Sequence, residues 1–428
     1  MPAVFQIQRI GISSSRLFGC SRTLHSKPIP QLLDQRNSTK AMVIPIQSGY
    51  QLEREVAVAA VLQASLVTRR IFDKLIRPGL QTGDNNQASI TKVDRSPVTV
   101  GDYTVQALLN FILSKYFPND EIVGEEDSSE LLKTTDKKHL QQIIDFTNEG
   151  LKEDRLSIPT DEEKWSKFRS QPALTEDELV KLIDLGKSAG GKPGENRRFW
   201  TLDPIDGTKG FLRGGQYAIC LALIVDGEAV LGVIGTPNLP LKGIPSPTDT
   251  EPTGVLFLAE KGSGAFQRAL GVDEYTEIKM KPHERGSLGR EGTFCESFDA
   301  GHSNQHVTVD IARKLNMLNA QSPIRIDSQA KYCVLARGDS DVYLRFPTQA
   351  DYQEKIWDHA AGSIIISEAG GKVVDLDGKP LDFSGGRTLS NNHPGFLACH
   401  NQVLVDVLKA AKAAHENQLK QQKIHTCK

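Results

Sequence analysis

The chain has 428 residues, of which 39% are hydrophobic and 24% are charged, close to the usage of ordinary globular proteins. Its 51 Lys and Arg residues almost balance its 53 Asp and Glu residues, which gives a net charge of -2. This balance excludes a protein whose whole surface binds nucleic acid or an anionic membrane, and no apolar run is long enough to span a bilayer. The length predicts two or three domains.

The six cysteines are scattered along the chain. None forms a C-x-x-C pair or has zinc-ligand spacing with a histidine. We therefore expect free thiols in a reducing compartment rather than a disulfide scaffold.

The N-terminal segment, residues 1–46, differs from the rest of the chain. Its first 33 residues contain four basic residues, five serines and no acidic residue. This composition is typical of a mitochondrial presequence, and it also fits a disordered tail that has no targeting function. We expect a mitochondrial protein if the segment is a transit peptide and a cytoplasmic one otherwise.

Helices and strands follow from periodicity and from end signals. Apolar residues at helical spacing predict a first helix from residue 51 to 77, ended by Pro78-Gly79, and a second helix over 103–116. Thr175 with Glu178 predicts a capping box at the start of a third helix over 176–187, and residues 186–194 form a Gly-rich loop. A hairpin over 217–235 turns at Asp226-Gly227, a surface loop covers 236–254, and strand character returns over 255–266.

Short strands then alternate with helices beyond residue 285. We expect strands at 342–344 and 372–375, a helix over 358–369, and a C-terminal helix over 401–423 that docks by its first half. This change of pattern predicts an α+β domain over 47–285 and an α/β domain over 286–428.

The most informative motif is Asp203-Pro204-Ile205-Asp206-Gly207-Thr208. An extended segment that ends in a tight turn would direct both carboxylates and the carbonyl of Ile205 toward one point. Two like charges so close repel each other, and Mg²⁺ is the usual cation for carboxylate and carbonyl ligands. Gly207 and Thr208 are expected to open a helix whose N–H groups hold a phosphate. Taken alone, the motif fits an ordinary loop equally well.

Further acidic residues lie near apolar segments elsewhere. Glu125 follows a short apolar strand, and Asp358 begins an apolar helix that Gly370-Gly371 closes. Each has a simple alternative, a solvated acidic turn for the first and a helix-dipole partner for the second. Together with Asp94 or Asp102 they predict a cage for several metal ions.

The series of motifs resembles the inositol monophosphatase superfamily, whose signature runs from an acid through Glu-Glu and D-P-[IL]-D-G-T to W-D-x-A-A-G. Within it, the chain is similar to the fungal 3'(2'),5'-bisphosphate nucleotidases over roughly residues 50–415. The resemblance implies a layered α-β-α-β-α sandwich of the inositol monophosphatase and fructose-1,6-bisphosphatase type, and two or three Mg²⁺ ions per site. The implied metal ligands are Glu125, Asp203, Ile205, Asp206 and Asp358.

The resemblance also implies the catalytic and substrate-binding residues. Asp102 and Thr208 match the pair that activates the attacking water. The stretches Gly301-His302-Ser303, Asp327 to Tyr332 and Asp341 to Arg345 match segments that bind 3'-phosphoadenosine 5'-phosphate. The implied substrate contacts are Gly207, Thr208, His302, Ser328, Lys331, Arg345 and Asp358. From the residues alone, His302 also fits a surface loop, Ser328 a helix cap, and Lys331 and Arg345 solvated charges.

The expected function is hydrolysis of the 3'-phosphate of 3'-phosphoadenosine 5'-phosphate and of its 5'-phosphosulfate analogue. The resemblance further implies inhibition by lithium or sodium and a role in sulfate assimilation and salt tolerance. We expect a monomer that binds a small nucleotide and neither nucleic acid nor membrane. One alternative is an inositol polyphosphate 1-phosphatase or inositol monophosphatase. Another is a catalytically silent nucleotide-binding regulator, although such a protein has no need of a repelling acid cluster.

Overall fold

The computed structural model describes residues 49–82, 89–91, 97–133, 137–153, 158–190, 198–244, 252–283, 288–289, 291–299, 305–317, 323–347, 352–391 and 395–426. All of them belong to one compact unit, residues 39–428. The N-terminal segment 1–46 and its predicted targeting role lie outside the described residues, as does the boundary predicted at residue 285. Within the described residues, every helix is too short or too polar to cross a membrane.

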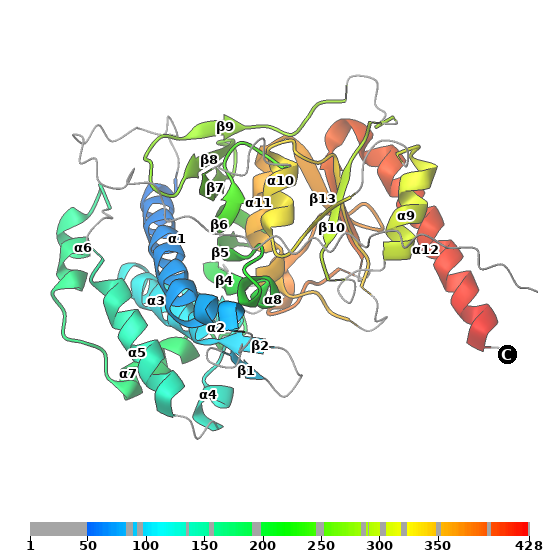
Figure 1. The fold of residues 1–428 in the computed structure, drawn as a ribbon. Coiled ribbons are helices and arrows are strands. Elements are labelled where there is room, and N and C mark those ends of the chain that lie inside the picture. The colour runs from blue at the N-terminus through cyan, green and yellow to red at the C-terminus, as the bar shows by residue number, and fades with distance from the viewer. Residues whose placement is uncertain are drawn as a thin grey trace, which may run out of the picture. The chain divides into compact units, whose positions relative to one another are not determined.

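Two β-sheets organise this unit (Figure 1). The seven-stranded sheet has the order β3 (Glu121–Gly124), β4 (Arg198–Asp206), β5 (Ala218–Val225), β6 (Glu228–Pro240), β7 (Thr253–Glu260), β8 (Ala265–Ala269), β9 (Thr276–Ile278). The five-stranded sheet has the order β11 (Ile324–Ile326), β10 (Phe294–Ser297), β12 (Val342–Arg345), β14 (Phe396–His400), β13 (Gly371–Asp375). A separate ribbon pairs β1 (Ser89–Thr91) with β2 (Pro97–Thr99).

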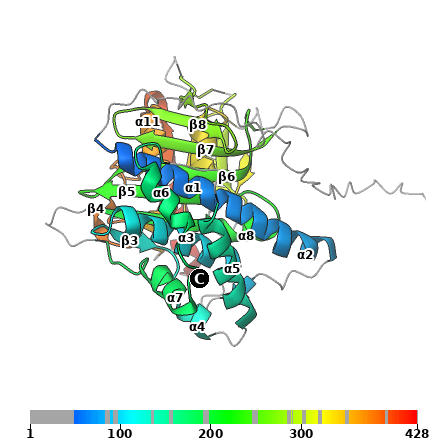
Figure 2. The same cartoon turned by 90° about the vertical axis from the view of Figure 1, so that its left-hand side faces the viewer.

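Helices cover both sheets and fill the space between them. One outer layer contains α1 (Gln51–Ile71), α3 (Val100–Tyr116), α5 (Lys137–Leu151) and α7 (Glu176–Asp184), and Figure 2 looks onto it. The middle layer contains α10 (Ala330–Ala336) and α11 (Ala360–Glu368), which contact both sheets. The other outer layer contains α9 (Gln305–Lys314) and α12 (Leu404–Thr426). The order is α-β-α-β-α, which confirms the predicted fold class.

The remaining short elements connect these layers. They are η2 (Phe72–Ile76), α2 (Arg77–Thr82), α4 (Ser129–Lys133), α6 (Glu162–Arg169), α8 (Thr208–Leu212), η3 (Ile356–Asp358), η4 (Phe383–Gly385) and η5 (Asn401–Val403). Of these, α8 begins with Thr208 and η3 ends with Asp358, so both contribute to the site described below.

Strand alternation explains how one sheet supports two hydrophobic cores. On β5, Ile219, Leu221 and Leu223 face the core beneath α1 and α3. The intervening residues Cys220 and Ala222 face the core shared with α10 and α11. Because side chains alternate between the two faces of a strand, β5 is apolar throughout and is buried on both sides. A third core lies between the five-stranded sheet and α9 and α12.

Several predicted elements are confirmed. The hairpin turns at Asp226-Gly227, and the capping box of Thr175 and Glu178 is formed at the start of α7. The first half of α12 packs into the third core through Val407 and Ala411. The four cysteines in the described residues are free and buried.

Three predictions about boundaries are wrong. Pro78 does not end the helical segment, because the π-helical turn η2 and then α2 follow α1 without a break and carry the chain past the proline to Thr82. The loop predicted over 236–254 is shorter, since β6 continues to Pro240 and β7 begins at Thr253. Asp358 is the last residue of the 3-10 turn η3, two positions before the start of α11, rather than in the helix itself.

Candidate active site

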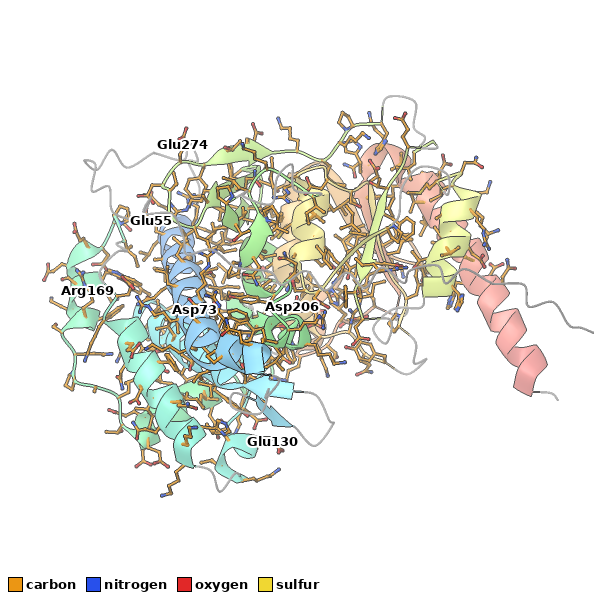
Figure 3. The ribbon with its side chains drawn as sticks, viewed as in Figure 1. Glu55, Asp73, Glu130, Arg169, Asp206 and Glu274 are labelled. Atoms are coloured by element: carbon orange, nitrogen blue, oxygen red, sulfur yellow. The ribbon has the colours of Figure 1, made fainter. Side chains whose placement is uncertain are left out.

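The two acids of the central motif lie at the end of β4. The pairing register of β4 with β5 shifts between Asp203 and Asp206. In a regular strand, residues three apart face opposite sides, so this shift brings both carboxylates to the side of the middle layer. Ile205 packs on the opposite side, in the core beneath α1 and α3. Figure 3 labels Asp206 beside α8.

Glu125 and Asp358 join these two acids from neighbouring segments. β3 pairs in parallel with β4, with Gly124 opposite Leu202, so the next residue, Glu125, lies beside Asp203. The Glu125 side chain forms a hydrogen bond with the carboxyl group of Asp203. η3 contacts the ends of β4 and β5 and carries Asp358 to the same place. The structure therefore brings together all four acidic side chains predicted as metal ligands.

Electrostatics in this cluster are unfavourable without a cation. Burial, followed by the charges of Glu125, Asp206 and Asp358, raises the pKa of Asp203 well above its ordinary value. Burial and the neighbouring Asp206 likewise raise the pKa of Asp358. Burial raises the pKa of Asp206 to about 6, although Lys331 and the backbone N–H of Gln329 counteract part of the rise. Burial is the largest cause for each of these three acids, and repulsion between neighbouring carboxylates adds to it, most clearly at Asp203.

One oxygen of the cluster has an unmet need for a partner. Asp203 is 3% exposed, and its Oδ1 atom is buried without a hydrogen-bond partner. A buried acceptor left unpaired costs free energy that a bound cation would remove. Four carboxylates with such an orphaned oxygen form a donor set suited to a hard divalent cation.

The predicted catalytic pair is also assembled. Thr208 is the first residue of α8, and its Oγ1 lies 3.3 Å from Oδ1 of Asp102 and 3.2 Å from the carbonyl oxygen of Ile205. Asp102 is fully buried in the first turn of α3, where its other oxygen accepts the backbone N–H and the hydroxyl of Thr99. This capping box fixes the Asp102 carboxylate beside Thr208.

Gly207 allows the chain to turn from β4 into α8. Its φ of +86° lies in the left-handed region, which favours glycine. An added Cβ would approach the Cβ of Ser328 to 3.1 Å. The helix begins at Thr208, as predicted, and has five residues; its role in holding a phosphate stays a prediction.

Three of the predicted nucleotide contacts are described, and they lie around the acid cluster. Ser328 is buried with a φ of +68°, and its Oγ accepts the N–H of Ala330, the first residue of α10, although the N-cap position itself is Gln329. Lys331 is buried, its Nζ donates to the carbonyl of Ser328 at 2.7 Å, and its charge faces Asp206. His302 lies outside the described residues.

Arg345 is held by a buried chain of polar groups. Its Nε lies 2.7 Å from Glu354, whose other oxygen lies 2.9 Å from Nε2 of His359, while Nδ1 of His359 lies 3.0 Å from the hydroxyl of Tyr332. Although burial opposes ionisation, Arg345 and His359 lower the pKa of Glu354 to about 2. The alternative of solvated charges is therefore wrong for both Lys331 and Arg345.

Glu354 and His359 have ligand atoms within 4.8 Å of one on Asp358, a spacing that would permit a metal. However, both oxygens of Glu354 and both ring nitrogens of His359 already have partners. We therefore assign this group to the support of Arg345 and not to a metal site.

The sequence interpretation missed two residues that support the acid cluster. Gln329 is 1% exposed, and its backbone N–H donates to Asp206. Arg387 donates to the carbonyls of Gly124 at 2.6 Å and Gly186 at 2.8 Å, and its guanidinium lies 4.7 Å from the ring centroid of Trp357. Gln329 lies inside a motif already matched to the family. Nothing in the local sequence of Arg387 indicates its role, since its partners are about 200 residues or more away.

Comparison with known proteins gives a consistent result. Residues 165–409 match the model of the inositol monophosphatase family. A relative from Schizosaccharomyces pombe, named 3'(2'),5'-bisphosphate nucleotidase, is 41% identical over 85% of this chain and 96% of its own length. A relative of the same name from Oryza sativa is 40% identical over 86% of this chain and 96% of its own. The solved structure of a Thermotoga maritima IMPase, 18% identical, superposes with a TM-score of 0.50 over 85% of this chain and 98% of its own. The chain belongs to the inositol monophosphatase family.

Proposed function

We propose that this chain is a Mg²⁺-dependent phosphomonoesterase acting on 3'-phosphoadenosine 5'-phosphate and its 5'-phosphosulfate analogue. It removes the 3'-phosphate and leaves AMP or adenosine 5'-phosphosulfate. The observation that carries the proposal is the cluster of four carboxylates beside the Thr208–Asp102 pair, with an orphaned oxygen on Asp203. The choice of substrate is supported by the printed names of relatives at 41% identity.

The residues that would hold the metal are Glu125, Asp203, Asp206 and Asp358, with the carbonyl of Ile205. We propose two or three Mg²⁺ ions, because four carboxylates carry more negative charge than one divalent cation neutralises. When bound, the ions neutralise the repulsion described above and lower the pKa of water in the site.

Thr208 and Asp102 provide the proton acceptor. The Asp102 carboxylate accepts the hydrogen of the Thr208 hydroxyl, which leaves the oxygen lone pairs of Thr208 available to a water molecule. Asp102 cannot turn away, because Thr99 holds its second oxygen. The pair therefore orients a water for attack on the phosphorus, and such positioned acid–base groups contribute about 10²–10⁴-fold to a rate.

The phosphate that is not cleaved requires cations of the protein. Arg345 presents a planar guanidinium that can bind a phosphate through two N–H groups, and its Nε is fixed by Glu354. Lys331 adds a second positive charge between Asp206 and the five-stranded sheet. We propose these two residues, with Ser328 and His302, as the contacts that distinguish a bisphosphate from a monophosphate.

A phosphate-release assay tests the proposal. The full chain with Mg²⁺ should release phosphate from 3'-phosphoadenosine 5'-phosphate much faster than from inositol 1-phosphate or inositol 1,4-bisphosphate. Faster release from either inositol phosphate would favour the inositol phosphatase alternative instead. Tight nucleotide binding without turnover in Mg²⁺ would favour the silent regulator.

Three further properties belong to the same proposal. The enzyme is inhibited by lithium or sodium, it acts in sulfate assimilation and salt tolerance, and it is a monomer. We also propose that residues 1–46 direct import into mitochondria if they are cleaved, the enzyme being cytoplasmic otherwise. Mass spectrometry of the mature N-terminus distinguishes these two locations.

A further inference from the structure

We propose that Gln329 is a positioning residue that fixes the distance between Asp206 and Asp358, two acids contributed by different segments of the chain. This inference rests on the proposed function, since it concerns the residues that would hold the metal. In this proposal, the hydrogen bonds of one buried residue connect the end of β4 to the start of α11.

The hydrogen bonds of Gln329 reach both segments. Its backbone N–H donates to Oδ2 of Asp206. Its side-chain Nε2 donates to the carbonyl of Trp357 at 2.7 Å, and its Oε1 accepts the N–H of Gly362 at 2.8 Å. Trp357 directly precedes Asp358, so the side chain holds the backbone on the N-terminal side of one acid while the main chain holds the other.

The chemistry of an amide suits this position. Gly362 is the third residue of α11, and the first N–H groups of a helix have no partner within the helix. The carbonyl of Trp357 faces the same amide from the preceding 3-10 turn. The amide of Gln329 donates from its nitrogen and accepts at its oxygen, so one uncharged side chain satisfies both groups.

Gln329 is itself held in place by its surroundings, so its hydrogen bonds can fix Asp206 relative to Asp358. It is 1% exposed and is followed directly by α10, which packs against α11 in the middle layer. Gly362 lies against Tyr332 of α10, where an added Cβ would approach the ring to 2.2 Å. The two helices therefore have little freedom to shift relative to each other while the amide is in place.

Replacing Gln329 by Met removes both side-chain hydrogen bonds, keeps a similar volume, and keeps the backbone N–H to Asp206. Outer hydrogen-bond partners of metal ligands affect metal affinity by about 10–100-fold. We expect the Gln329→Met protein to bind Mg²⁺ at least about tenfold more weakly than the wild type in a calorimetric titration without substrate. The increase in melting temperature caused by Mg²⁺ should shrink in parallel.

Gln63→Met is the matched control. Gln63 is also a buried glutamine, 2% exposed, and its Nε2 donates to the carbonyl of Gly150, which joins α1 to α5 away from the acid cluster. This variant should lose stability but bind Mg²⁺ like the wild type. If Gln329→Met bound Mg²⁺ with wild-type affinity, the positioning role would be refuted.

A second variant covers the case in which Gln329→Met does not fold. Gln329→Asn keeps the amide but is one methylene shorter, so it cannot reach both Trp357 and Gly362. In the same titration, weaker Mg²⁺ binding than in the wild type supports the positioning role, and wild-type affinity refutes it. A wild-type protein that binds no Mg²⁺ would instead refute the metal dependence in the proposed function. The two failures are therefore distinguishable.

Discussion

Asp206→Asn should stabilise the metal-free protein while it abolishes turnover. The carboxyl group of Asp206 has a pKa of about 6 in the folded chain, against an ordinary value of 3.8. Keeping Asp206 ionised in the folded state at pH 7.5 therefore costs about 3 kcal/mol, at about 1.36 kcal/mol per pKa unit. Asparagine has the same shape, carries no charge, and can still accept the N–H of Gln329.

The sign of the pH dependence follows from the raised pKa. Above pH 6 Asp206 is ionised in both states, and the full cost is present. Between pH 6 and pH 4 the folded protein takes up the proton while the unfolded chain does not yet do so, so the cost declines. At pH 4 the advantage of the asparagine variant should be about 0.5 kcal/mol.

Urea denaturation in EDTA measures the effect. The free energy of unfolding of Asp206→Asn should exceed that of the wild type by about 3 kcal/mol at pH 7.5, and saturating Mg²⁺ should reduce or reverse the difference. Asp375→Asn is the control, because Asp375 is buried but accepts N–H groups of Asp377, Lys379 and Asn391. It should lower stability. An Asp206→Asn protein no more stable than the wild type in EDTA would refute the argument that burial of the ionised Asp206 carboxylate is costly.

Three other substitutions test separate parts of the site. Thr208→Val should lower kcat by about 10²-fold or more with little change in KM, whereas Thr208→Ser should retain most activity; equal kcat for Val and Ser would contradict the role of the hydroxyl. Glu354→Gln should raise KM for the bisphosphate and lower stability by about 3 kcal/mol above pH 4.5, a difference that shrinks as the pH falls toward the folded pKa of about 2. An unchanged KM would show that Glu354 does not hold Arg345 for the substrate. Arg387→Met should weaken Mg²⁺ binding in calorimetry by releasing the carbonyl of Gly124 ahead of Glu125, and wild-type affinity would refute this support.

Much of the fold was predictable because its signals are local. The capping box at Thr175 and the hairpin at Asp226-Gly227 depend on residues within four positions of each other, and both are confirmed. The layered fold class followed from a resemblance carried by the acidic motifs, and it is confirmed as well. The π-helical turn before Pro78 has no comparable local signal, and the first helix was therefore ended too early.

The candidate site was predictable to the extent that its residues lie in motifs. The acids of the D-P-I-D-G-T motif, Glu125 and Asp358 are brought together, although their roles as metal ligands stay predictions. The supports of the site were not predictable, because they depend on contacts between distant segments. Arg387 is 263 residues from its partner Gly124, and the Glu354–His359 pair matters only because β12 places Arg345 beside it. Hydrophobic patterning carries no information about such polar partners in a core.

The site is divided between early and late parts of the chain, and this has a consequence for biosynthesis. Asp102, Glu125, Asp203 and Asp206 are synthesised first, whereas Asp358 and the η3–α11 segment that carries it come about 150 residues later. A nascent chain in which Asp358 has not yet been synthesised presents at most three of the four acids, and it lacks Arg387 to hold the carbonyl of Gly124 ahead of Glu125. Mg²⁺ should bind such a fragment weakly, so metal-dependent protection against proteolysis should appear only when the last layers have closed. Metal loading would then report that synthesis and folding are complete.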